Sequence, residues 1–93
     1  MTEHREWVTG QADYTGTGQL AHAEHDETLH LLADGDFGSS GVVALELKNP
    51  EGNFRSFPET ELTTTGGKRV FLSKGQQWRL KITGCNSVNA EVR

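Results

Sequence analysis

The chain has 93 residues, the length of one domain, so we expect a single domain over residues 1–93. Its net charge of −4 argues against a nucleic-acid partner. No stretch approaches the ~20 apolar residues of a membrane span, and the first residues lack the apolar core of a signal peptide. We therefore expect a soluble protein, made inside the cell, with no membrane or nucleic-acid partner.

The N-terminal part of the chain is polar but carries two aromatic residues, Trp7 and Tyr14. Strands are predicted near residues 5–10 and 16–22, and residues 1–28 are expected either to add strands to the domain or to form an arm used in assembly. Aromatic side chains are favoured contact residues in protein interfaces. We expect Trp7 and Tyr14 either to close the end of the fold or to contact a partner, and they are the candidate partner-binding residues.

The next segment, "LAHAEHDETLHLLADG", is ambiguous between helix and strand. A strand is predicted over residues 28–33, where apolar residues are dense. Helix-forming residues are also abundant over residues 20–34, and Gly35 suits the end of a helix. A helix over residues 20–34 therefore remains an alternative.

Three side chains in this segment, His22, Asp26 and His30, are spaced four residues apart and share a face in either conformation. On a helix they advance about 6 Å per step, which suits shared metal ligation, whereas on a strand the step is about 13 Å. We expect a strand and a solvated polar face without a metal. A small metal-dependent protein using these histidines is the alternative from the enzyme class. The Asp-Gly-Asp triplet at 34–36 lacks the further ligands of a calcium loop.

Alternation of apolar and polar residues dominates the rest of the chain, as in "VVALELK" and "WRLKIT". This period of two is typical of half-buried antiparallel strands, and it places Trp78 in the predicted core with Leu80 and Ile82. Turn residues such as Pro50 and Gly52 separate the runs. The predicted strands cover residues 41–48, 53–57, 60–64, 69–73, 77–83 and 87–92. Such spacing favours an all-β fold, an antiparallel β-sandwich of jelly-roll-like form.

Charge is distributed unevenly along the chain. Residues 1–46 hold nine acids and one base, a net of −8, and residues 47–93 hold four acids and eight bases, a net of +4. One interpretation is that acidic and basic strands pair inside the sheets. The other is a head-to-tail contact between subunits, which is the kind of interface that closes rings.

Sequence signatures of catalysis are missing. No Gly-x-Ser-x-Gly segment surrounds a serine, and no glycine-rich phosphate loop precedes a helix. Cys85, the single cysteine, rules out a disulfide framework and a cysteine-based zinc site, and it has no obvious activating histidine. The sequence therefore predicts a protein without enzymatic activity, metal or cofactor.

From about residue 29 to residue 92, the chain resembles small all-β virion structural proteins of tailed bacteriophages. The shared pattern consists of glycines and alternating strands, with an aromatic residue, arginine and leucine in a late strand. The first part of the pattern matches Gly35, Phe37, Gly38, Val43, Leu45, Leu47, Gly52 and Phe54. The second part matches Gly67, Phe71, Leu72, Gly75, Trp78, Arg79, Leu80, Gly84 and Val88. The chain departs at Phe54, where such sequences often carry tryptophan.

The resemblance implies a non-enzymatic component repeated on the virion. The function it favours is a capsid decoration, or cement, protein that binds the major capsid protein on the outside of the assembled head, as a homo-oligomer and most simply a trimer. The alternative is a tail or head fibre module that recognises a host surface ligand such as a glycan.

Overall fold

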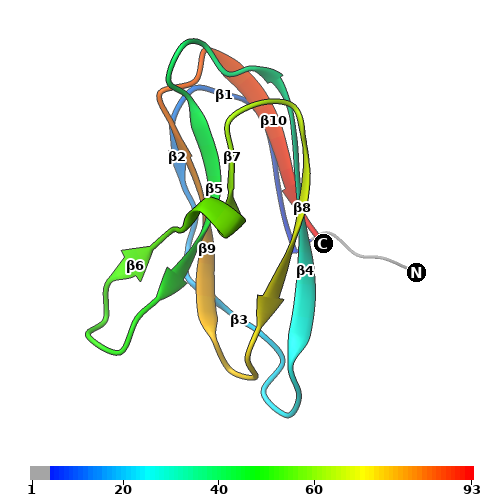
Figure 1. Ribbon diagram of the computed structural model, residues 1–93, viewed down its shortest axis with the longest axis vertical. Helices are drawn as coiled ribbons and strands as arrows, with labels where there is room; N and C mark the ends of the chain where they lie inside the picture. The colour runs from blue at the N-terminus through cyan, green and yellow to red at the C-terminus, as the bar shows by residue number, and fades with distance from the viewer. Residues whose placement is uncertain (1–4) are drawn as a thin grey trace.

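The computed structural model describes residues 5–93, which form two antiparallel sheets packed face to face (Figure 1). The elements are β1 (Glu6–Gln11), β2 (Tyr14–Thr15), β3 (Gln19–Leu20), β4 (Glu27–Asp36), β5 (Val42–Lys48), β6 (Phe54–Arg55), the 3₁₀ turn η1 (Pro58–Thr60), β7 (Glu61–Leu62), β8 (Gly66–Leu72), β9 (Gln77–Thr83) and β10 (Ser87–Val92). The expected all-β antiparallel sandwich is confirmed. Within the described residues, no helix is long and apolar enough to cross a membrane.

The two sheets are built from strands of both halves of the chain. One sheet has the order β1-β10-β4-β8, and the second has the order β2-β9-β5-β6, with β3 also paired to β9 and β7 to β5. The ladders therefore join residues of the acidic half to residues of the basic half, except at the end of β5, where Leu47 and Lys48 pair with residues of the same basic half. Arg79 Nε on β9, for example, lies 2.7 Å from Glu46 Oε1 on β5. The interpretation that acidic and basic strands pair inside the sheets is confirmed, whereas a head-to-tail subunit contact stays a prediction.

The core lies between the two inner faces, and strand alternation supplies it. On β9, Trp78, Leu80 and Ile82 are buried, which confirms the expected core position of Trp78. The inner face of the four-stranded sheet meets them with Leu29, Leu31, Ala33, Val70, Leu72, Val88, Ala90 and Val92. Burial of aliphatic and aromatic side chains at about 25 cal/mol per Å² is the main favourable term in folding.

The helical alternative for residues 20–34 is wrong, because β4 occupies Glu27–Asp36. The period-two burial of Leu29, Leu31 and Ala33 matches the flat core between two sheets, so tertiary packing overrides helix propensity. Gly35 does not end a helix. It lies within β4 with φ +127°, and a Cβ there would come within 2.5 Å of the Ser87 carbonyl oxygen.

The single strand predicted over residues 16–22 is also wrong, since the structure forms β2 and β3 with Gly16 and Gly18 between them. Both short strands pair with β9, so they act as one interrupted edge strand. Gly16 approaches the β9 backbone, where an added Cβ would lie 3.2 Å from the Leu80 carbonyl oxygen. At Gly18 an added Cβ would lie 3.3 Å from the Phe54 ring, so the interruption leaves room for that side chain.

The chain between β5 and β8 is less regular than predicted. The strand predicted over residues 53–57 shortens to β6, and that over 60–64 shortens to β7. Pro58 begins the intervening turn, where proline is tolerated because its missing N–H has no helical partner. Thr60 closes the turn, since its hydroxyl oxygen accepts a hydrogen bond from Phe57 N–H at 3.0 Å.

We predict that Trp78→Ala removes cooperative unfolding or lowers the melting temperature by tens of degrees. Emptying a large buried aromatic site costs about 3–5 kcal/mol, against about 5–15 kcal/mol for a whole domain. Thermal unfolding followed by circular dichroism measures this. Trp7→Ala is the matched control, because Trp7 is 61% exposed while Trp78 is 0% exposed. Equal, small shifts for both variants would contradict the prediction.

Candidate functional site

The two candidate partner-binding residues lie in different surroundings. Trp7 is on β1, at the edge of the four-stranded sheet, and is 61% exposed. Tyr14 is on β2 in the second sheet, half-buried, and it packs against the core. The structure therefore does not bring Trp7 and Tyr14 together in one surface patch.

Tyr14 joins the two sheets at their edge through Glu6. The Tyr14 hydroxyl donates a hydrogen bond to Glu6 Oε1 at 2.7 Å, and Gln19 Nε2 donates one to Glu6 Oε2 at 2.7 Å. The bond to Glu6 is the main cause that raises the pKa of Tyr14, because it favours the protonated phenol. Glu6 and Trp7 are neighbours on one strand, so their side chains point to opposite faces of β1. Tyr14 thus holds β1 from inside while Trp7 faces out.

Trp7 belongs to a row of side chains that crosses the outer face of the four-stranded sheet. The strand register pairs Trp7 with Glu91, Glu91 with Leu32, and Leu32 with Gly67. We call these four residues the middle row. Beside it is an open groove of about 490 Å³. Its lining consists of Trp7, Leu32, Ala33, Asp34, Thr65, Gly66, Asn89, Ala90 and Glu91. Because Gly66 and Gly67 carry no side chains, the outer surface of the sheet is flat at the β8 end of the row.

The two ends of this outer face differ in charge. On one side of the middle row, Asp34 is exposed and accepts a hydrogen bond from Asn89 Nδ2 at 3.1 Å. On the other side is a basic row. His30 on β4 pairs with Arg69 on β8, and its backbone exchanges hydrogen bonds of 2.9 and 3.0 Å with Arg93. The face is therefore acidic at one end and basic at the other, and its middle row combines the apolar Trp7 and Leu32 with Glu91, which is paired with Arg93.

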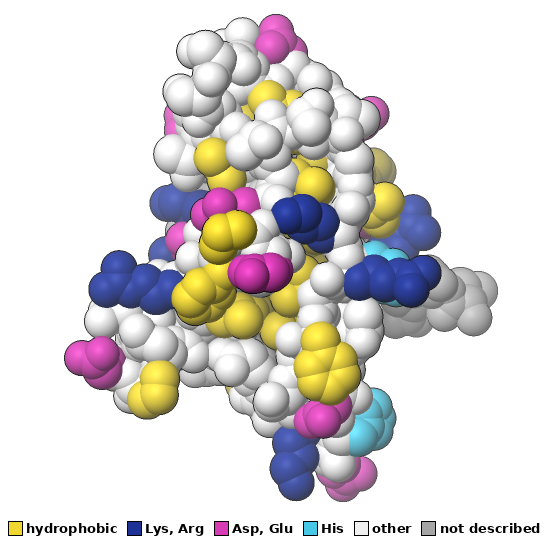
Figure 2. All heavy atoms as spheres, viewed as in Figure 1, with side chains coloured by type: hydrophobic (Ala, Val, Ile, Leu, Met, Phe, Trp, Pro, Cys, Tyr) yellow, Lys and Arg dark blue, Asp and Glu magenta, His cyan; other side chains and the backbone are white. Residues whose placement is uncertain are grey.

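Figure 2 shows the molecule from the side, with basic side chains standing next to apolar ones along its right-hand margin. It also shows apolar side chains gathered near the middle of the view, around the place of η1 in Figure 1. Phe57, at the start of η1, is 49% exposed in this second area. Lys68 Nζ donates a hydrogen bond to the Pro58 carbonyl oxygen at 2.6 Å, which ties η1 to β8. This second area therefore closes the gap between the sheets.

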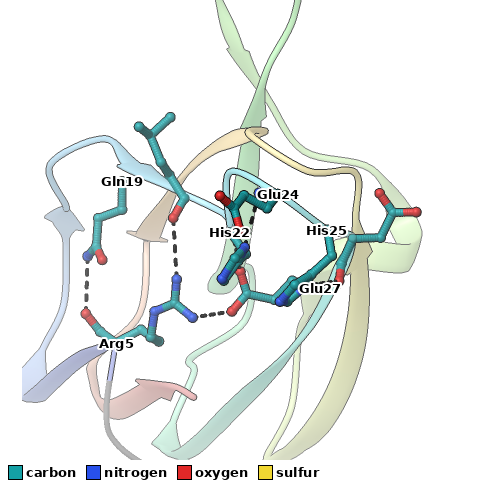
Figure 3. Close-up of polar contacts among 8 residues, drawn as sticks. Arg5, Gln19, His22, Glu24, His25 and Glu27 are labelled. Atoms are coloured by element: carbon teal, nitrogen blue, oxygen red, sulfur yellow. Dashed lines mark hydrogen bonds and ion pairs between the residues drawn. The ribbon is translucent and has the colours of Figure 1, made fainter.

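The histidines form a different group from the one that their spacing predicted. Figure 3 shows His22 and His25 in the loop before β4, where their rings stack with centroids 3.6 Å apart. The Glu24 N–H donates a hydrogen bond to His22 Nδ1 at 3.1 Å. Asp26 instead accepts a hydrogen bond from the Lys74 N–H at 3.0 Å, and His30 faces outward on β4. Among residues 5–93, no three His, Cys, Asp or Glu side chains are grouped as metal ligands.

The loop is anchored by an ion pair between Arg5 and Glu27 that the sequence did not reveal (Figure 3). Burial by itself raises the pKa of the Glu27 carboxyl, but hydrogen bonds from Arg5 and from the His22 N–H outweigh it and hold the pKa below its usual range. Arg5 also donates a hydrogen bond to the Leu20 carbonyl oxygen at 3.3 Å. Spacing gives no signal for a pair 22 residues apart, although Arg5 is the only base in the acidic half.

The remaining groups singled out in the sequence have structural roles. The Asp36 carboxylate accepts hydrogen bonds from Asn86 Nδ2 and the Gly38 N–H, which lower the pKa of Asp36 and fix the turn after β4. Cys85 is buried, and burial is the main cause that raises the pKa of its thiol. Since the thiolate is the reactive form, Cys85 is poorly nucleophilic.

We predict that Glu27→Gln destabilises the protein at neutral pH by about 1–2 kcal/mol, because a charge-assisted hydrogen bond is lost. A carboxyl whose pKa is lowered by folding stabilises above the pKa of an unfolded glutamate, about 4.3, and loses that effect as pH falls through the lower folded pKa. The gap in melting temperature between wild type and variant should therefore be full at pH 7 and close in acid. Glu51→Gln, in an exposed turn, is the control. A gap that is constant with pH would contradict this assignment.

We also predict that no transition metal binds specifically at His22, Asp26 and His30, because the structure places them in a loop and on the outer face of β4. Elemental analysis of the purified protein measures this directly. About one equivalent of zinc, lost in His22→Ala, would overturn the prediction.

Comparison of the chain with protein-family models, with curated proteins and with solved structures finds no match. No residue role is therefore transferred from a relative.

Proposed function

We propose that this protein is a non-enzymatic virion structural protein of a tailed bacteriophage, most specifically a decoration protein that binds the major capsid protein on the outside of the head. The observation that carries the proposal is the groove beside Trp7 on the outer face of the four-stranded sheet. This groove is a contact surface. It is shallow, largely apolar, and borders an exposed tryptophan.

The groove offers one residue of the kind that anchors protein interfaces, the exposed Trp7, with Leu32 beside it and the acidic Asp34 and Glu91 in its walls. Interface centres are enriched in tryptophan and arginine, and a few such residues supply most of the binding free energy. Here Trp7 stands on an antiparallel sheet, paired to β10 through Glu91, so its backbone position is fixed before binding. Preorganisation of this kind lowers the entropy cost of association.

The strand order supports a jelly-roll assignment. If β2 with β3, and β6 with β7, each count as one interrupted strand, two four-stranded sheets remain. The chain then passes from one sheet to the other at every connection except the one from β5 to β6. Jelly rolls are double-sheet folds that occur in viral capsid and lectin domains. The fold is thus compatible with a virion protein, while the function is argued from the outer face.

A decoration protein binds its shell more tightly because many copies bind the same shell. Each contact is weak when the groove is shallow, but several copies held on one lattice turn later contacts into intramolecular ones, which raises avidity by ~10²–10⁴. A small domain with one apolar face is suited to this mode of binding.

We predict that the purified protein co-sediments with assembled shells that lack it, and that cryo-electron microscopy shows density at regular lattice positions. Trp7→Ala should weaken binding by about thirtyfold, since loss of an interface tryptophan costs at least ~2 kcal/mol. Leu20→Ala is the matched control, because Leu20 is 58% exposed but lies on β3 in the second sheet.

Two results would overturn the decoration proposal. The first is a protein that ignores shells and is found at the tail tip or bound to host glycans, which would make it a fibre module. The second is shell binding that Leu20→Ala weakens as much as Trp7→Ala, which would place the contact away from the groove.

A further inference from the structure

We infer that the outer face of the four-stranded sheet binds a second copy of this chain, related to the first by a twofold axis. This inference rests on the proposed function and names a neighbouring copy, in place of the major capsid protein itself, as the occupant of the groove beside Trp7. Trp7→Ala would then weaken shell binding by removing the pairing of copies that supplies avidity. It concerns the isolated protein, so it can fail or succeed independently of shell binding.

The first support is the order of side chains along the outer face. On β4, Asp34, Leu32 and His30 point outward in succession, because Leu31, Leu29 and Ala33 are buried on the inner face. Successive outward residues on a strand are about 7 Å apart. The acidic end and the basic end therefore lie at similar distances on either side of Leu32.

The second support is symmetry. In a twofold interface the same surface patch of both subunits forms the contact. Each residue must therefore be complementary to the residue that the axis places opposite it. A twofold axis along the middle row runs perpendicular to the strands. It places the acidic end of one copy opposite the basic end of the other. Asp34 of one copy then faces the basic row of the other, with His30 and Arg69, and the reverse contact forms at the same time.

The charges also exclude the other simple arrangement. An axis parallel to the strands would place the acidic end of one copy against the acidic end of the other and the basic row against itself, and like charges in contact are strongly unfavourable. The chosen axis places Glu91 of one copy opposite Glu91 of the other, and Arg93, whose Nε lies 2.8 Å from Glu91 Oε1 of the same copy, offsets this like charge. Electrostatics therefore selects the axis along the middle row.

The third support is shape. The groove lies on the acidic side of the middle row, with Asp34 and Glu91 in its walls and Leu32 and Trp7 beside them. In this arrangement the basic row of the second copy stands opposite the groove. Long basic side chains such as Arg69 cover apolar surface with their stems while their charged ends reach acidic groups. An arginine over the face of Trp7 adds a cation–π contact.

The area of the outer face determines the affinity expected for the dimer. Four strands about 4.8 Å apart and about seven residues long present on the order of 450 Å² per copy, or roughly 900 Å² in total. Stable interfaces usually exceed about 1,200 Å², and smaller ones belong to transient complexes. We therefore expect a weak dimer, with a dissociation constant in the micromolar range, that becomes effective when copies are held side by side. The expected trimer stays a prediction, and the twofold pair is the arrangement inferred from the outer face.

The test is analytical ultracentrifugation of the full chain over a range of concentrations up to roughly 0.5 mM, which covers micromolar dissociation constants. Asp34→Arg and Arg69→Asp should each raise the dissociation constant about tenfold or more, because each reversal places like charges together twice per dimer. The double variant should regain most of the loss, since its charges are again opposite. Glu51→Arg, in the β5–β6 turn, is the matched control and should leave association unchanged. Melting temperatures confirm that all variants are folded.

Dimerisation that both single variants weaken and the double variant restores supports the inference. A protein that stays monomeric at every concentration overturns it. So does association that ignores Trp7→Ala and Asp34→Arg. Monomers that bind shells through Trp7 would assign the groove to the shell instead, and the decoration proposal would survive. Dimers that do not bind shells would support the twofold interface and overturn the decoration proposal.

Discussion

The packing of the two inner sheet faces around Trp78 is the contact on which the rest of the structure depends. Side chains on a strand alternate, so burying Leu31 and Ala33 against the second sheet forces Leu32 to the outside. The same condition holds on β10 and β8, where buried valines leave Glu91 and Gly67 outside. The outer face thus consists of the side chains that alternate with the buried core residues along each strand. A shift of one residue in any of these strands would exchange the two faces.

Polar contacts at the edges determine how the N-terminal strand joins this core. Glu6 binds Tyr14 and Gln19 of the second sheet, and Glu27 binds Arg5, so two carboxylates hold β1 against both layers. Both carboxylates are partly buried, and hydrogen bonds to charged groups are stronger than those between neutral groups. Trp7 lies between these anchors in sequence and points the other way. The backbone that carries the exposed Trp7 is therefore held in place by contacts on the opposite face of β1.

The outer face and the edges together are the features on which the proposed assembly role rests. The inner faces supply the buried core, whereas the outer face places Trp7 and Leu32 between charged ends of opposite sign. Such a face favours one orientation of its partner, since a reversed partner meets like charges. A weak, oriented contact is suited to a repeated lattice, in which avidity supplies the strength and orientation supplies the order.

The sequence by itself determined the class of fold, the strands around Leu45, Trp78 and Val88, and the burial of Trp78. These follow from side-chain alternation, which is a local property of the chain. It also identified Trp7 as a candidate contact residue. The helical alternative at residues 20–34, the division of β2 from β3, and the Arg5–Glu27 pair were decided only by the tertiary structure. The same is true of the middle row, because Trp7, Glu91, Leu32 and Gly67 come from four strands far apart in the chain. Strand register between distant segments is fixed by which faces the whole core buries, and no local pattern contains that information.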